Sequence, residues 1–260
     1  MENQSFLDHL EALRWHLIRS FSVILLSTII VFCFPEILFD KIIFAIQSPD
    51  FTSYKAICRM SNFLGMKDAF CITKSPFVIM NINMSGQFYT HIVSSLIAGF
   101  ILSFPYFSWE IWRFVKPALY KNEQRYTRGI VFFISLLFIS GVLFGYFLVA
   151  PISVQFLGNY QVSSQVINQI NLNSYISTVT SVSLANGLLF QLPILVYFLS
   201  QMGILTPEFL RKYRKHSLVV VLILSAIITP PDILSQILVS FPLLILYEIS
   251  IKISSKFEQK

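Results

Sequence analysis

The segment Gly129–Ala150 reads GIVFFISLLFISGVLFGYFLVA and contains no Asp, Glu, Lys or Arg. About 20 consecutive apolar residues are enough for a helix to cross the hydrocarbon core of a bilayer. The whole chain has this character, because 55% of its 260 residues are apolar and only 12% are charged, whereas an ordinary soluble domain has about 25% charged residues. The composition excludes a soluble globular protein and indicates an integral membrane protein.

Five further segments extend this pattern. Four of them together contain only two charged side chains, Arg19 and Glu248; they are Leu17–Phe34, Ser174–Gly203, Ser217–Pro231 and Ile233–Ile251. The fifth is less apolar but has the apolar centre Leu96–Leu102. We therefore predict one polytopic membrane domain over residues 1–260, with six spans at about 17–36, 87–109, 128–150, 173–202, 216–229 and 232–251. An all-α fold is expected, because hydrocarbon offers the backbone no hydrogen-bond partners and the alternation of a barrel strand is absent.

The basic residues predict the orientation of the spans, because Lys and Arg accumulate on the cytoplasmic side of a membrane. If the spans alternate, one side receives only Lys41, Lys55, Arg59, Lys67 and Lys74, and the other side receives the remaining fourteen of the 19 basic residues. This bias predicts cytoplasmic N- and C-termini. It also accounts for the net charge of +6, so that nucleic-acid binding is not needed to explain it.

The last two spans are expected to be short. Only 14 residues separate Lys215 from Pro230, which corresponds to about 20 Å of helix against a hydrocarbon core of about 30 Å. The sequence Thr229-Pro230-Pro231-Asp232 predicts a turn between the two spans, because proline restricts the residue before it and Asp232 suits the first turn of a helix. The role of Asp232 could be helix capping alone.

Two acidic residues in polar segments are candidate binding residues. Near the N-terminus, apolar residues at 6, 10, 13 and 17 predict an amphipathic helix that leads into the first span, with Glu11 on its polar face. Glu123 is an acid within the most basic loop. Both have a simpler interpretation: the polar face of the helix would lie in solvent at the membrane surface, and Lys121 and Arg125 would neutralise Glu123.

Four motifs resemble those of the TatC family, the multispanning receptors of the Sec-independent, twin-arginine protein export system. They are His9-Leu10-Glu11-Ala12-Leu13-Arg14, the segment 114–125 with its Pro117-Ala118-Leu119-Tyr120 core, Phe190-Gln191-Leu192-Pro193, and Thr229-Pro230-Pro231-Asp232-Ile233-Leu234-Ser235-Gln236. They occur in the order typical of the family and extend over nearly the whole chain. The predicted topology agrees with this resemblance.

The resemblance implies that the protein binds the signal peptides of folded cargo proteins through their paired arginines. Carboxylates can accept guanidinium groups bidentately, and in this family they lie on the N-terminal helix and in the loop after the second span. Glu123 matches the loop position. The N-terminal acid is Glu11, one residue before the position at which the family has it and this chain has Ala12, and one residue rotates a helical side chain by about 100°.

The resemblance also implies partners and an energy source. Gln191, near the middle of the fourth span, matches a position that faces a groove for the single-span subunit TatA; its alternative role is to join helices by a hydrogen bond. A homo-oligomeric complex in the bacterial cytoplasmic membrane and use of the proton motive force are also expected, and the presence of a TatB-like partner stays open. No phosphate-binding loop and no other cofactor site is found in the sequence.

Of the three cysteines, Cys58 and Cys71 lie together in the long outer loop. A disulfide between them is predicted if that loop lies in an oxidising compartment, and two reduced thiols are the alternative. The four histidines are scattered, so no metal site is expected. Intramembrane enzymes are disfavoured because their motifs are absent. A small-solute secondary transporter is the alternative function, although the matched broken helices and mid-membrane charges of that class are missing.

Overall fold

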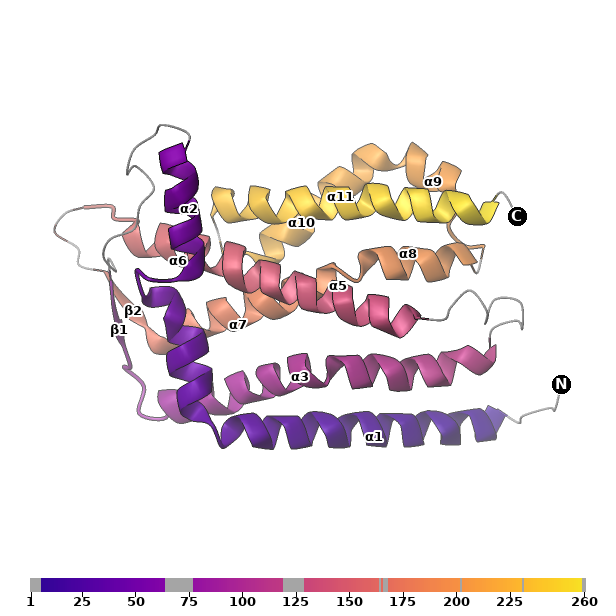
Figure 1. Ribbon diagram of the computed structural model, residues 1–260, viewed down its shortest axis with the longest axis horizontal. Helices are drawn as coiled ribbons and strands as arrows, with labels where there is room; N and C mark the ends of the chain where they lie inside the picture. Colours follow the sequence, from indigo (N-terminus) through magenta and orange to yellow (C-terminus); the bar gives the residue numbers. More distant parts are fainter. Residues whose placement is uncertain are drawn as a thin grey trace.

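The computed structural model describes residues 6–63, 77–118, 129–163, 165, 168–201, 203–230 and 232–258. Long helices lie side by side, and both chain termini are at the same end of the molecule (Figure 1). The expected class, an all-α membrane fold, is confirmed. Among the described residues, five helices are long and apolar enough to cross a membrane: Leu10–Phe32, Gly86–Val115, Ile130–Asn159, Leu172–Ser200 and Ile233–Ser255.

The first helix, α1 (Phe6–Phe32), contains both the amphipathic start and the first span without a break. Its 27 residues contain no Gly or Pro, so nothing in the sequence interrupts a helix about 40 Å long. Pro35 follows soon after its end. In the structure α1 lies at one edge of the molecule and packs mainly on α3 (Gly86–Val115).

The middle of the bundle is built from helices that contain breaks. The third span consists of α5 (Ile130–Phe144), the short π-helix η5 (Gly145–Val149) and α6 (Ala150–Asn159). The fourth consists of α7 (Leu172–Leu189) and α8 (Leu192–Gln201), which are separated at Phe190 and Gln191. Pro193 explains this second break, because it has no N–H to donate to the carbonyl of the preceding turn.

Small residues allow α5 and η5 to pack closely on α7. A Cβ atom added at Gly141 would lie 2.6 Å from the carbonyl oxygen of Asn186, and one at Gly145 would lie 2.9 Å from the Cα of Ser183. Next to this contact, the ring of Phe138 stacks on Phe104 of α3 with 3.5 Å between the centroids. Close backbone approach and dispersion take the place of the hydrophobic effect, which does not drive helix association in lipid.

The last two helices are α10 (Arg214–Ile228) and α11 (Ile233–Glu258), and the short α9 (Pro207–Lys212) precedes them. The prediction of a short fifth span is confirmed, since the 15 residues of α10 extend over about 22 Å. The prediction of a short last helix is wrong, because α11 has 26 residues. Its apolar part ends near Ile251, but the helix continues and packs on α8, where Ser200 donates a hydrogen bond of 2.8 Å to Ser254.

The end of the molecule opposite the termini contains smaller elements that the sequence analysis did not predict. They are the π-helix η1 (Ile37–Ile43), the 3-10 helix η2 (Phe44–Gln47), α2 (Thr52–Phe63), and two parallel strands, β1 (Val78–Met80) and β2 (Gln169–Asn171). β2 directly precedes α7, and β1 ends at Met80, shortly before α3 begins at Gly86, so their pairing brings the first turns of these helices together (Figure 1).

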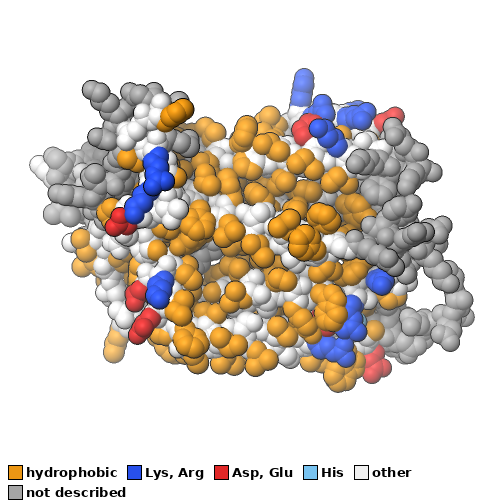
Figure 2. All heavy atoms as spheres, viewed as in Figure 1, with side chains coloured by type: hydrophobic (Ala, Val, Ile, Leu, Met, Phe, Trp, Pro, Cys, Tyr) orange, Lys and Arg blue, Asp and Glu red, His pale blue; other side chains and the backbone are white. Residues whose placement is uncertain are grey.

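Figure 2 shows that the surface between the two ends is mostly hydrophobic, with charged side chains gathered toward the ends. Large apolar side chains are exposed along this surface, among them Phe21, Leu102, Phe132 and Phe241. Exposure of so much apolar surface is not expected of a soluble monomer. This surface therefore fits contact with lipid.

Candidate receptor site

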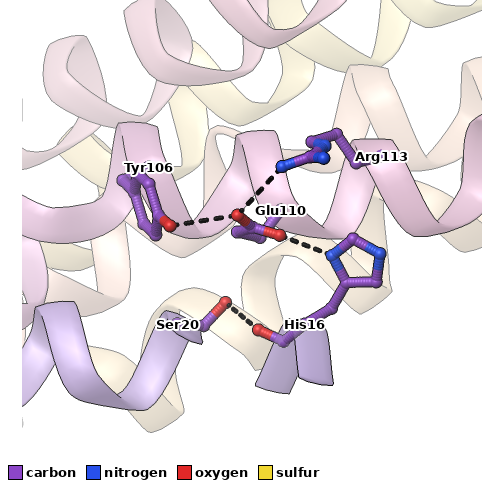
Figure 3. A network of polar contacts seen from close by, with 5 residues as sticks. All are labelled: His16, Ser20, Tyr106, Glu110 and Arg113. Atoms are coloured by element: carbon purple, nitrogen blue, oxygen red, sulfur yellow. Dashed lines mark hydrogen bonds and ion pairs between the residues drawn. The ribbon is translucent and has the colours of Figure 1, made fainter. Parts of the chain in front are cut away.

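The candidate site lies at the end of the molecule that contains both termini. Its centre is Glu110, near the C-terminal end of α3, with a side chain that is only 1% exposed. Tyr106 and Arg113 lie four residues before and three residues after Glu110, so all three share one face of the helix. His16 of α1 faces them from the neighbouring helix (Figure 3).

The Glu110 carboxylate contacts three groups that can donate hydrogen bonds. His16 Nδ1 lies 2.5 Å from Oε2, the Tyr106 hydroxyl donates to Oε1 at 3.0 Å, and Arg113 Nη1 lies 3.5 Å from Oε1. The Arg113 guanidinium also lies 4.8 Å from the centre of the Trp109 ring. Because a buried charge is costly unless it is paired and hydrogen-bonded, these donors explain how the acid is accommodated near the end of an apolar helix.

Glu110 is not among the site residues predicted from the sequence. It lies among aromatic residues typical of a membrane interface, and its partner His16 is 94 positions earlier in the chain. One local signal was available: Tyr106, Glu110 and Arg113 place three polar groups on one face at the end of an apolar helix.

The two predicted peptide-binding acids are not seen together. Glu11 is exposed on α1. It precedes His16 by five residues, so it points about 140° away from the face that contacts Glu110. Glu123 lies outside the described residues, between η4 (Lys116–Ala118) and α5. The role of both acids stays a prediction.

Gln191 lies in the break between α7 and α8. Its side-chain Nε2 donates a hydrogen bond of 3.1 Å to the backbone oxygen of Ile134 in α5. Within the described part of the chain, no hydrogen bond to its side-chain oxygen is formed. The amide nitrogen therefore joins two helices, which is the alternative role considered for Gln191. The amide oxygen is left as a hydrogen-bond acceptor.

The predicted turn before α11 has Asp232 as a helix cap. Asp232 is buried, and its Oδ1 accepts a hydrogen bond of 2.5 Å from the backbone N–H of Ser235. Its own N–H donates to the carbonyl oxygen of Pro230 at 2.6 Å. Pro231 lies outside the described residues. The contacts of Asp232 agree with a structural role.

Cys58 of α2 forms a disulfide bond, and Cys33 is a free, exposed thiol. Cys71, the predicted partner of Cys58, lies outside the described residues, so the pairing stays a prediction. Mass spectrometry of the unreduced protein should find the peptides that contain Cys58 and Cys71 linked. Complete alkylation of both thiols without a reductant would contradict the pairing.

Comparison with known proteins determines the family. The family model described as "Sec-independent protein translocase protein (TatC)" matches residues 8–242. The chain belongs to the TatC family. The Sec-independent protein translocase protein TatC of Blattabacterium sp. subsp. Periplaneta americana (strain BPLAN) is 40% identical to it over 256 residues, which cover 98% of this chain and 96% of the relative. The TatC of Desulforapulum autotrophicum is 34% identical over 251 residues, or 96% of this chain and 84% of the relative.

The fold agrees with this family assignment. A crystal structure of a "Twin Arginine Translocase Receptor- TatC" superimposes with a TM-score of 0.71 at 32% sequence identity, and the match covers 95% of this chain and 98% of the other. A second crystal structure, of the TatC receptor in DDM, gives a TM-score of 0.72 at the same identity. As a TatC protein, the chain is a membrane component of the Sec-independent translocase.

Proposed function

We propose that this TatC protein is the cytoplasmic-face receptor for twin-arginine signal peptides. The observation that carries the proposal is its match, over almost the full length of both chains, to a protein described as a twin-arginine translocase receptor. In this proposal Glu123 accepts one arginine of the peptide bidentately, and Glu11 contributes a second negative charge. Arginine suits such a site better than lysine, because its planar guanidinium presents a fixed pair of donors to a carboxylate.

A binding experiment separates this function from that of a small-solute transporter. The purified protein in detergent should retain an immobilised signal peptide that contains two arginines, and should retain the same peptide with two lysines much less. A solute transporter should retain neither peptide. Equal retention of both peptides would contradict recognition of the arginine pair.

We propose that the chain also recruits a TatA-like single-span subunit, through the side-chain oxygen of Gln191. Gln191→Leu should leave peptide binding intact and weaken crosslinking to TatA in native membranes, because the partner loses a hydrogen bond that is worth about 0.6–2 kcal/mol in a membrane. Export should fall in part rather than stop.

Gln236→Leu is the matched control for Gln191→Leu. The Gln236 amide also donates to a backbone oxygen of a neighbouring helix, at 3.2 Å from Leu222, but it lies on α11. Gln236→Leu should therefore reproduce any loss of stability without the loss of TatA crosslinking. If both variants crosslink as the wild type does, Gln191 does not contact the partner.

We propose that the protein lies in the bacterial cytoplasmic membrane as one membrane unit, with both termini in the cytoplasm. The positions of the two termini at one end of the molecule and the distribution of basic residues support this orientation. We also propose that the protein assembles as a homo-oligomer and that transport uses the proton motive force. In this proposal the protein has no enzymatic activity of its own and needs no cofactor.

Cysteine labelling tests the orientation. Single cysteines at Asn122 and Gln165, in a background that lacks the three native cysteines, should react from opposite sides of the membrane. Gln165 is exposed, whereas its neighbour Asn168 holds the loop through hydrogen bonds to the carbonyl oxygens of Gly158 and Tyr160, so Gln165 is the safer position. Labelling of Asn122→Cys by an external, impermeant reagent would reverse the proposed orientation.

A further inference from the structure

We infer that Glu110 is a positioning residue of the receptor, which holds α1 against α3 through His16 and thereby orients α1 for binding the peptide. The inference rests on the proposed receptor function, because the value of orienting α1 depends on what binds there. Its basis is the arrangement of contacts along α1.

Among the described elements, α3 is the one on which α1 packs broadly. α1 lies at the edge of the molecule (Figure 1), and only 6% of its most apolar stretch, within Leu10–Phe32, is buried. Packing on a single neighbour leaves α1 without support from the rest of the bundle. Any loss of contact with α3 should therefore affect α1 more than a helix inside the bundle.

Within the broad contact between α1 and α3, three features lie at different heights along the helices. The Phe32 ring stacks on His91 with 4.0 Å between the centroids, near the end of the molecule that is opposite the termini. Further along, the backbone of Thr28 approaches Gly99 so closely that an added Cβ would lie 2.7 Å from it. The contact between His16 and Glu110 lies at the end that contains the termini. Among the residues whose side chains the structure describes, it is the one hydrogen bond between a side chain of α1 and a side chain of α3.

The contact between His16 and Glu110 depends on how α1 is rotated about its axis. The Glu110 carboxylate is almost fully buried, and a buried charge that loses a hydrogen-bond partner is strongly destabilised. Phe32 and Thr28 direct one face of α1 at α3 toward the far end of the molecule, and the contact between His16 and Glu110 does so at the end that contains the termini, next to the N-terminal turns. Ser20, which donates a hydrogen bond to the backbone oxygen of His16 at 2.9 Å, lies one turn further along and is also buried.

The rotation of α1 decides which residues the N-terminal turns present to a peptide. With His16 directed at Glu110, Ala12 lies four residues earlier and is rotated by only about 40°, whereas Glu11 is rotated by about 140°. If α1 were free to rotate, these residues would point in many directions. The peptide would then have to order the helix on binding, and this cost would lower the affinity of the peptide. Glu110 thus contributes to affinity without contacting the arginines.

Glu110→Gln tests this role because it keeps the size of the side chain and removes its charge. The variant should bind the twin-arginine peptide about tenfold more weakly, a loss at the lower end of what a charged hydrogen bond contributes. It should weaken binding of the twin-lysine peptide by the same factor. Hydrogen exchange of residues 10–20 should be faster than in the wild type. Glu248→Gln is the matched control, because Glu248 pairs with Arg214 at 2.8 Å between α11 and α10 and should change none of these results.

Restoring the contact by a covalent bond completes the test. In a Cys33→Ser background, the pair His16→Cys and Glu110→Cys should bind the peptides weakly, and a short bis-thiol crosslinker between the two cysteines should restore both affinities. Three results would each overturn the inference: wild-type affinity in Glu110→Gln, a loss confined to the arginine peptide, or weak binding that persists after crosslinking. If the wild-type protein fails to prefer arginine over lysine, the proposed receptor function fails instead, and the exchange of residues 10–20 still tests the hold of Glu110 on α1.

Discussion

Replacing Glu123 with Gln should weaken binding of a twin-arginine peptide by about 1.5–3 kcal/mol, the contribution of a hydrogen bond to a charged group. The substitution keeps the size of the side chain and removes the charge that a guanidinium requires. The twin-lysine peptide should lose much less affinity, because lysine cannot use the bidentate geometry. Titration of both peptides against wild-type and variant protein, at one salt concentration, measures the difference.

Two further variants help to interpret this result. If Glu11 reaches the peptide, Glu11→Gln should also weaken binding of the twin-arginine peptide more than that of the twin-lysine peptide. The loss should be smaller than in Glu123→Gln. Glu208→Gln, in the first turn of α9, changes an acid outside the predicted binding motifs and should leave both affinities unchanged. If Glu123→Gln weakens both peptides equally, or neither, then Glu123 only balances Lys121 and Arg125, and the arginine pair is recognised elsewhere.

Replacing Gly99 with Ala should detach α1 from α3. The added Cβ would lie 2.7 Å from both the backbone nitrogen and the Cα of Thr28, and backbone atoms cannot move aside as the end of a side chain can. Overpacking of this kind typically costs about 1–3 kcal/mol. We expect a lower unfolding temperature in detergent, and faster hydrogen exchange throughout α1 than in the wild type.

The neighbouring residue provides a control for this prediction. Ala98 lines a mostly apolar groove of about 600 Å³ between α1, η1, α3, α5, η5 and α7, so Ala98→Val adds volume where space exists. This variant should unfold near the wild-type temperature. A Gly99→Ala protein with unchanged α1 exchange would mean that the two helices separate at little cost.

The sequence predicted the membrane helices well because long apolar runs reflect the solvent around them. It did not predict α2, β1 or β2, since these short elements lie outside the long apolar runs, where hydropathy gives no comparable signal. The last helix, α11, was predicted too short for a related reason. The apolar run ends near Ile251, but the helix continues beyond it, where Ser254 packs on α8. The contact between Glu110 and His16 joins distant segments, and a single sequence does not reveal such pairs.

The pairing of β1 with β2 also constrains the order in which the protein can form. Ile79 pairs with Ile170, so the strand ladder closes a loop of roughly ninety residues, and contacts of such long range form slowly because the chain entropy is lost before the contact is made. The second strand is synthesised only after the whole of the third span, α5 to α6, has been synthesised. The starts of α3 and α7 therefore remain apart during insertion, and their joining is a late step in the biogenesis of the bundle.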